Sequence, residues 1–391
     1  MEGTNVAQVL GVVAAALVAA KVGAEIAVRL KQPAVLGELL AGVLLGGSFL
    51  GWVDPSDRAI HVLAELGVAL LLFEIGLETD LRKLFAVGSA SMTVAAAGVV
   101  LPFLGGYAVS RAFGLEATTA IVVGASLTAT SVGIVGRVLS DLGRLQGTEG
   151  QIVLGAAVID DVLGLVILSL IQDAAGPAGA TIGGAIKAAA LAFGFIIVAL
   201  AVGGPLTALV LRSTRIALTK GGLVTICMAM AFGAAFLADA AGSAPIIGAF
   251  CAGTLLGMSD RAKDIEKHVE SVSPLLVPLF FVTAGASLKV SALNPTDPAA
   301  RWPLFFAIVL LLVACATKFA AGYAPYWVKG NKALIGAAMI PRGEVGIIFA
   351  QIGHASGKLD EAQFAAVMLM VAGTTFLAPP LLRWLGTRKT E

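Results

Sequence analysis

The chain has 391 residues, of which 58% are hydrophobic and 13% are charged, and its formal net charge is +1. A soluble globular domain carries about 25% charged residues, so this composition excludes an ordinary soluble protein, and the balanced charge gives no sign of nucleic-acid binding. Apolar runs of about 20 residues, long enough to cross a bilayer, recur along the whole chain. The sequence therefore predicts an all-α polytopic membrane protein that is embedded in a lipid bilayer.

Hydropathy, with breaks at clusters of charge, Pro and Gly, predicts thirteen membrane spans. The first continues through Lys21 and Glu25 to Arg29 and is too long for a signal peptide. In chain order, the predicted spans cover residues 6–29, 34–52, 60–78, 85–111, 116–138, 149–172, 182–211, 221–240, 243–258, 270–288, 302–326, 332–355 and 361–384.

Lysine and arginine are distributed unevenly between the two sets of loops that join these spans. Seventeen of the 26 fall on one side and six on the other, and the remaining three lie within spans. The side richer in Lys and Arg faces the cytoplasm. We therefore expect a multi-pass protein of the cell (inner) membrane with its N-terminus outside and its C-terminus in the cytoplasm.

Two parts of the chain resemble each other. Residues 37–46 match residues 248–257 at six of ten positions, including all three glycines, and residues 71–77 resemble residues 280–286. The offsets, 211 and 209 residues, nearly agree, and the matching spans run in opposite directions through the bilayer. This pattern indicates an inverted repeat, which is characteristic of secondary transporters whose sites lie near the bilayer midplane.

Spans 5 and 12 are partners under this repeat, and both contain helix-breaking sequences. Span 5 carries the hydroxyl-rich segment 126–133, and span 12 carries 340–346 with Pro341 and two glycines. Broken helices are tolerated at membrane depth where they line a cavity. Their free carbonyl and hydroxyl oxygens suit a small hard cation, and their half-helix ends carry partial charges that need partners.

Asp160 and Asp161 stand side by side in span 6, and everything around them is apolar. Carboxylates in hydrocarbon are expensive, so the pair needs a reason such as an ion path, a proton relay or a counter-charge. Lys318 lies within span 11, and since neighbours on a helix point about 100° apart, one aspartate can pair with Lys318 while the other faces a cavity. A carboxyl group that holds either a proton or a cation is the simplest basis for exchange. The other polar residues within these spans are Thr128, Thr130, Ser131, Arg342 and Glu344.

Other interpretations of these residues stay open. Lys318 can be a purely structural ion-pair partner, and Arg342 and Glu344 neutralise half-helix ends more readily than they bind substrate. Four glutamates of spans 2 and 3 can line a route or cap their helices: Glu38, Glu65, Glu74 and Glu78. Two catalytic aspartates of an intramembrane protease would lie on separate helices, whereas Asp160 and Asp161 share one. A channel is disfavoured because no filter-like loop is present in the sequence.

The chain resembles the monovalent cation:proton antiporter-2 family, and within it the bacterial NapA-type Na⁺/H⁺ antiporters. The matching segments follow one another along essentially the whole chain: residues 32–38, 71–79, 129–134, 156–164 and 341–346. This resemblance implies two inverted six-helix repeats joined by a linker helix, with two crossed discontinuous helices. It also implies an elevator-like movement of a core domain against a dimerisation domain. The implied division is dimerisation domain 1–84 and 220–300, core domain 85–172 and 301–391, and linker helix 173–219.

The resemblance also implies roles for individual residues. Asp161 is expected to be the essential carboxylate that binds the ion and the proton, while Asp160 pairs with Lys318 until a cation breaks the pair. Thr130 and Ser131 are expected to lie at the ion site. Two further residues, Arg342 and Glu344, are expected to compensate the charges where the broken helices cross.

From these features we predict a homodimeric secondary transporter, not an enzyme, that exchanges Na⁺ or Li⁺ for H⁺ electrogenically. The transported Na⁺ is expected at Asp161 and Asp160, and no cofactor, resident metal or soluble protein partner is implied. A K⁺/H⁺ antiporter or a Kef-like K⁺ efflux unit of the same fold is the alternative. The sequence leaves open the choice between Na⁺ and K⁺, and whether Lys318 itself carries a proton.

Overall fold

The computed structural model describes residues 6–175, 182–216, 222–288 and 298–387. Helix accounts for 80% of the structure, and within these ranges there is no strand. The helices are α1 (Val6–Arg29), α2 (Ala34–Leu45), α3 (Arg58–Glu78), α4 (Leu81–Ala86), α5 (Gly88–Ala112), α6 (Ala117–Ser126), α7 (Val132–Asp141), α8 (Thr148–Ala175), α9 (Ile182–Ile216), α10 (Gly222–Ala240), α11 (Pro245–Gly257), α12 (Ala262–Val269), α13 (Ser273–Ala286), α14 (Pro298–Ala321), α15 (Lys332–Ala338), α16 (Glu344–Ala355) and α17 (Glu361–Thr387).

The all-helical membrane fold is confirmed, whereas the count of thirteen spans stays a prediction. In the described ranges six helices are long and apolar enough to cross a membrane alone, and the pair α12 and α13, bent by 59°, adds a seventh as one span. The long helices are α1, α3, α5, α10, residues 301–321 of α14, and α17. Two predicted spans end early: α2 stops at Leu45, before an extended Gly46, and α14 stops at Ala321.

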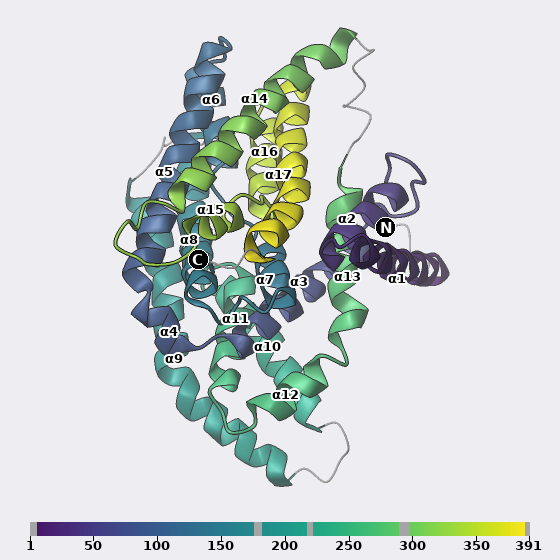
Figure 1. Ribbon diagram of the computed structural model, residues 1–391, viewed down its shortest axis with the longest axis vertical. Coiled ribbons are helices and arrows are strands. Elements are labelled where there is room, and N and C mark those ends of the chain that lie inside the picture. Colours follow the sequence, from purple (N-terminus) through teal and green to yellow (C-terminus); the bar gives the residue numbers. More distant parts are fainter. Residues whose placement is uncertain (1–5, 176–181, 217–221, 289–297, 388–391) are drawn as a thin grey trace.

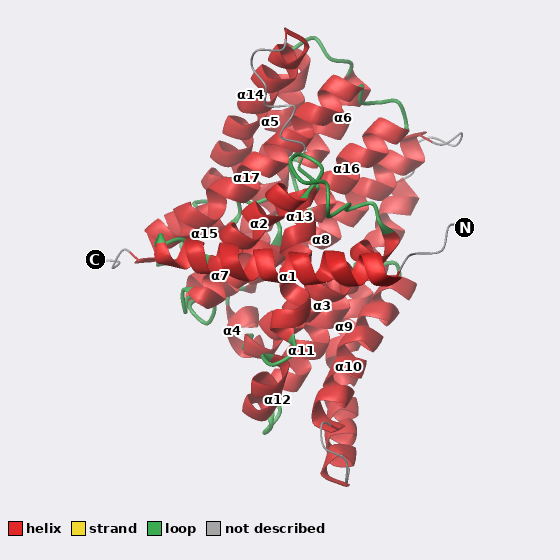
Figure 2. Cartoon of the chain, turned by 90° about the vertical axis from the view of Figure 1, so that its right-hand side faces the viewer, coloured by secondary structure: helices red, strands yellow, loops and turns green. Residues whose placement is uncertain are grey.

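The helices pack as two groups (Figures 1 and 2). The α3 group contains α1–α3 and α10–α13, and the α8 group contains α5–α8 and α14–α17. Helix α9 contacts α8 on one side and α10 and α11 on the other, so it lies between the groups. Helix α7 belongs to the α8 group but also packs against α2 and α3. It therefore forms the seam between the groups, where Leu72 of α3 and Val135 of α7 share one buried apolar cluster.

Glycines make the closest helix contacts in the α3 group. A Cβ atom on Gly42 of α2 would collide with the carbonyl oxygen of Val282 in α13, and one on Gly253 of α11 would collide with that of Phe73 in α3. Small residues allow such close approach of membrane helices. Gly42 and Gly253 are 211 residues apart, and Phe73 and Val282 are 209 apart. The two contacts therefore stand at the offsets that the sequence repeat predicts.

A second contact of the same kind supports this correspondence. A Cβ atom on Gly76 would collide with the carbonyl oxygen of Phe250, and one on Gly285 would collide with that of Leu39. Gly76 and Gly285 are 209 residues apart, and Leu39 and Phe250 are 211 apart, so the offsets are again those of the repeat. Each half of the chain thus supplies one helix that packs on a helix of the other half, α2 on α13 and α11 on α3.

Candidate functional site

Two breaks in helices build the centre of the α8 group. The first lies between α6, which ends at Ser126, and α7, which begins at Val132. The Thr128 hydroxyl donates to the carbonyl oxygen of Ala125 at 2.7 Å, and this bond satisfies an acceptor at the end of α6. Serine and threonine hydroxyls compete in this way with the backbone bonds of a helix. The hydroxyl-rich sequence therefore ends one half-helix before the next begins.

The second break lies between α15, which ends at Ala338, and α16, which begins at Glu344. Pro341 has no N–H to donate and its ring clashes with the preceding turn, so it disfavours a continuous helix at this place. The backbone N–H of Ser131 donates to the carbonyl oxygen of Pro341 at 2.8 Å. A Cβ atom on Gly343 would lie 2.7 Å from the Ser131 Oγ, so a larger residue there would displace the Ser131 side chain. The two breaks thus touch each other directly.

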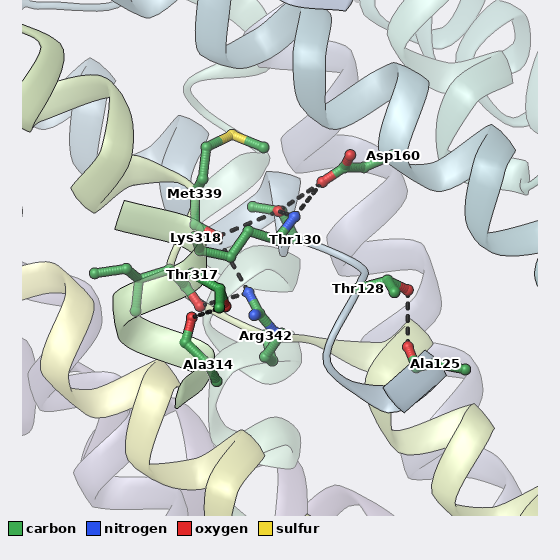
Figure 3. A network of polar contacts seen from close by, with 10 residues as sticks. Ala125, Thr128, Thr130, Asp160, Ala314, Thr317, Lys318, Met339 and Arg342 are labelled. Atoms are coloured by element: carbon green, nitrogen blue, oxygen red, sulfur yellow. Dashed lines mark hydrogen bonds and ion pairs between the residues drawn. The ribbon is translucent and has the colours of Figure 1, made fainter. Parts of the chain in front are cut away.

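Lys318 of α14 reaches into this junction (Figure 3). Its Nζ donates to the Asp160 Oδ2 at 2.6 Å and to the Thr130 Oγ1 at 2.8 Å. The Thr130 hydroxyl in turn donates to the same Asp160 oxygen at 2.8 Å. The side chains of Lys318 and Asp160 are completely buried. Three residues from α8, α14 and the first break therefore form one closed polar contact inside an apolar helix bundle.

The two neighbouring aspartates have different surroundings. Oδ2 of Asp160 accepts both hydrogen bonds, while its Oδ1 has no partner among the described residues. Asp161 is 4% exposed and also acts electrostatically on Lys318. A buried ion pair compensates each charge only while both partners are present, because removing one leaves the other uncompensated. Anything that replaces Lys318 at Asp160 must therefore bring a positive charge of its own.

Arg342 is fully buried beside the second break. Its Nη1 donates to the carbonyl oxygens of Met339 and Ile340, at 3.2 and 2.9 Å, immediately after the end of α15. A cation at a helix C-terminus is favourable because the free carbonyl groups there carry partial negative charge. Arg342 therefore lies at the end of a half-helix, where the sequence predicts a residue that compensates the partial charge. For Glu344, only the backbone at the start of α16 is described, and its side chain lies outside the described part.

The remaining predicted site residue, Ser131, is 5% exposed at the contact between the breaks. The sequence did not single out three other residues that complete the site. The Met339 carbonyl oxygen lies 3.3 Å from the Thr130 Oγ1 as a second, more distant acceptor, and the Thr375 hydroxyl of α17 donates to the Arg342 carbonyl at 2.7 Å. A Cβ atom on Gly98 of α5 would lie 3.1 Å from the Lys318 Nζ. Gly98 is one of many glycines in the sequence, so its spacing gives no signal of this role.

Nothing in the described ranges gathers three or more His, Cys, Asp or Glu side chains as a metal-binding group. A small cation at this place would instead combine carboxylate oxygens with hydroxyl and carbonyl oxygens. These are the hard ligands that alkali and alkaline-earth ions prefer. Asp160, Asp161, Thr130 and the free carbonyls of the breaks supply atoms of this kind.

Known proteins that this chain is similar to are ion transporters. The family model described as "Sodium/hydrogen exchanger, transmembrane" matches residues 12–388. The chain is 39% identical to the high-affinity Na⁺/H⁺ antiporter NhaS3 of Synechocystis, over 95% of this chain and 89% of the relative. It is 34% identical to the Na⁺/H⁺-K⁺ antiporter GerN of Bacillus cereus, over 95% of each chain.

The fold is also similar to a solved structure. The sodium proton antiporter MjNhaP1 of Methanocaldococcus jannaschii, at pH 8, aligns with a TM-score of 0.65 at 20% sequence identity. The alignment covers 96% of this chain and 94% of that one. At this level of identity the likeness concerns the arrangement of helices alone.

Proposed function

The chain belongs to the sodium/hydrogen exchanger family, and from that premise we propose that it exchanges Na⁺ or Li⁺ for H⁺ through Asp160, Asp161 and Lys318. As a Na⁺/H⁺ antiporter it is a transporter, and the family moves both ions without a cofactor. The single observation that carries the assignment is the ion pair between Lys318 and Asp160, completely buried where two broken helices meet.

Exchange follows from competition for the two carboxylates. A cation entering the site binds Asp161 together with the unpartnered Oδ1 of Asp160, and its charge weakens the hold of Asp160 on Lys318. Thr130 and Ser131 supply further oxygen ligands at the first break. When the cation leaves, Lys318 returns to Asp160 and a proton takes its place on Asp161. Cation and proton never occupy Asp161 together, so transport of one requires release of the other.

We propose that exchange is electrogenic. With the cation bound, both aspartates are ionised and Lys318 has given up its proton to the solution. With the cation released, Lys318 is charged against Asp160 and Asp161 is protonated. The proton-loaded state therefore carries one positive charge more than the cation-loaded state, so two protons move for each Na⁺. If Lys318 keeps its proton throughout, exchange is electroneutral instead.

The two-repeat architecture is supported by the paired glycine contacts of the α3 group. The breaks of α6 with α7 and of α15 with α16 occupy corresponding places in the two halves. We propose that α1–α8 and α10–α17 are two inverted six-span repeats, with α9 as the linker. The orientation, with the N-terminus outside and the C-terminus in the cytoplasm, rests on the distribution of Lys and Arg.

We further propose that the α3 group is the dimerisation domain and the α8 group is the mobile core. The support is that every residue of the ion site belongs to the α8 group, so a movement of this group carries the whole site with it. In this proposal the α8 group slides along the α3 group, like an elevator, and opens the site to each side of the cell membrane in turn. Two copies of the chain associate through their α3 groups.

K⁺ is a second candidate cation, because GerN, one of the similar proteins, is described as a Na⁺/H⁺-K⁺ antiporter. The carboxylate, hydroxyl and carbonyl oxygens at the site suit either ion. A K⁺/H⁺ antiporter or a Kef-like efflux unit would therefore use the same groups.

Purified protein in proteoliposomes with an imposed pH gradient tests the function. We expect Na⁺ and Li⁺ to dissipate the gradient at lower concentrations than K⁺. Failure of all three cations to do so would contradict the antiporter assignment. A greater effect of K⁺ than of Na⁺ would transfer the assignment to the K⁺/H⁺ alternative.

A further inference from the structure

A second group of charged side chains lies on the seam between the α3 group and the α8 group, away from the ion site. Arg137 is on α7, which packs against both α2 and α3, and its charge acts on three carboxylates of those helices: Glu38 on α2 and Glu74 and Glu78 on α3. Helix α7 begins directly after Thr130 and Ser131, so any displacement of the ion site against the α3 group carries Arg137 with it.

Two of the three carboxylates on the α3 group have hydrogen-bond partners. The Ser140 hydroxyl of α7 lies 3.0 Å from both carboxylate oxygens of Glu78, which joins the two groups across the seam. Within the α3 group, the Ser273 hydroxyl donates to Glu74 at 2.6 Å. The close approach of α7 to α3 brings Gly136 against the side chain of Ile75, where a Cβ atom would collide.

Glu38 differs from these two carboxylates. It is 6% exposed, and its Oε2 has no hydrogen-bond partner in the described ranges. Lys21 of α1 and Asp141 of α7 are the other charged groups that act on it besides Arg137. Buried polar atoms in native proteins are nearly always hydrogen-bonded, so such an atom calls for an explanation.

Arg137 is also incompletely paired. Its Nε lies 3.3 Å from the Asp141 Oδ1, one turn away on the same helix, but the Nε–H makes no hydrogen bond within the described part of the chain. About one-third of each of these two side chains is exposed, at 32% and 33%. A pair of this kind, four residues apart on a helix and partly in solvent, is weak. Arg137 can therefore leave Asp141 at little cost.

We propose that Arg137 exchanges Asp141 for Glu38 when the α8 group moves against the α3 group, so that a Glu38–Arg137 ion pair stabilises the second arrangement. This proposal rests on the alternating-access movement proposed above. In the present arrangement the Glu78–Ser140 contact joins the α3 group to the α8 group. In the second arrangement Glu38 gains the partner that it lacks here. Both residues are positioning residues, because neither contacts the ion site, and they set the relative stability of the two arrangements.

Transport and binding measurements on the same variants test the proposal. Glu38→Gln and Arg137→Gln are each expected to lower the turnover of Na⁺/H⁺ exchange about tenfold, since a loss of 1.4 kcal/mol corresponds to a factor of ten. Equilibrium binding of ²²Na⁺ should change by less than about threefold, because the ion site is intact. The double variant should be no slower than either single variant. Glu65→Gln, an exposed carboxylate on α3, is the matched control.

The decisive test is to exchange the charges of the two residues. Glu38→Arg and Arg137→Glu should each slow turnover, and the two together should restore it to within about threefold of the unaltered protein. Unchanged turnover in Arg137→Gln, or a charge-exchanged protein no faster than the single variants, would overturn the proposal. Absence of ²²Na⁺ binding and exchange in the unaltered protein would overturn the proposed function, and this proposal with it, whereas normal binding together with unchanged turnover in the variants would overturn this proposal alone.

Cross-linking provides a measurement that does not depend on transport. In a protein without its three native cysteines, the pair Glu38→Cys with Arg137→Cys and the pair Glu78→Cys with Ser140→Cys are compared during exchange and at equilibrium. Cross-linking of the first pair should rise under the condition that lowers cross-linking of the second. Equal cross-linking of the first pair under both conditions would contradict the exchange of partners.

Discussion

Lys318 contacts Asp160 through a single carboxylate oxygen: its Nζ lies 2.6 Å from Oδ2, while Oδ1 has no hydrogen-bond partner among the described residues. The Thr130 hydroxyl donates a hydrogen bond to the same Oδ2 at 2.8 Å. Both contacts of the lysine and the threonine thus fall on one oxygen of the carboxylate. In the exchange proposed above, the other oxygen, Oδ1, is the one that a cation would bind.

Removing the lysine should affect both stability and voltage dependence. Lys318→Gln leaves the charge of Asp160 buried without its partner, and breaking a buried pair in this way costs about 3–5 kcal/mol. We expect a lower midpoint of thermal unfolding and exchange that no longer responds to membrane potential. The double variant Lys318→Gln with Asp160→Asn should recover much of the stability, because neither charge remains. Persistent voltage-driven exchange in Lys318→Gln would show that the lysine does not carry the second proton.

Asp161→Asn should abolish exchange and leave the fold intact. Asparagine has nearly the same shape but can neither hold a proton for exchange nor neutralise a cation. Dissipation of an imposed pH gradient in proteoliposomes measures the loss, and thermal unfolding tests the fold. Asp239→Asn, which alters an exposed carboxylate near the end of α10, is the matched control and should transport normally. Retained exchange in Asp161→Asn would move the ion site elsewhere.

Thr130 should matter through its hydroxyl group alone. Thr130→Val keeps the shape but removes one partner from both Lys318 and Asp160, and hydrogen bonds to charged groups contribute about 1.5–3 kcal/mol. We expect a lower melting temperature and an apparent Na⁺ affinity weaker by at least about tenfold. Thr130→Ser keeps the hydroxyl and should stay close to the unaltered protein. If the valine and serine variants behave alike, the hydroxyl takes no part in binding.

The equivalent glycine contacts of the α3 group should be equally intolerant of a methyl group. Gly42→Ala and Gly253→Ala each place a Cβ atom against a backbone carbonyl of another helix, and overpacking typically costs about 1–3 kcal/mol. Gly233→Ala on α10, where nothing lies within 4 Å, should be neutral or stabilising because alanine favours helix. Thermal unfolding compares the three variants. Similar melting temperatures for all three would remove this support for the repeat.

Much of the molecule was accessible from the sequence. The density of apolar residues predicted the all-helical membrane fold, because only structures that satisfy their own backbone hydrogen bonds survive in lipid. Pro341 and the hydroxyl-rich segment 126–133 predicted the two interrupted helices, because each removes or competes for helical backbone bonds. The paired aspartates and Lys318 stood out as charges whose cost in hydrocarbon requires a reason.

Other features could not be predicted from the pattern. The sequence did not reveal which helices are long enough to span the bilayer alone, because short helices such as α2 end at local turns inside apolar runs. It gave no sign that Gly98 lies against Lys318 or that Thr375 of α17 binds the Arg342 carbonyl. These contacts join residues that are far apart in the chain, and their partners depend on helix packing.

The sequence by itself determined that this protein is a helical membrane protein with interrupted helices and charged residues within its spans, because composition, helix-breaking residues and charges inside apolar runs are local properties of the chain. Only the tertiary structure decided that Asp160 holds Lys318 through one oxygen, that the two helix breaks meet at Ser131 and Pro341, and that Glu38 lies buried near Arg137 without a hydrogen bond to its Oε2 in the described ranges. The reason is that pairing of buried charges depends on distances between helices, which the packing of the whole bundle sets.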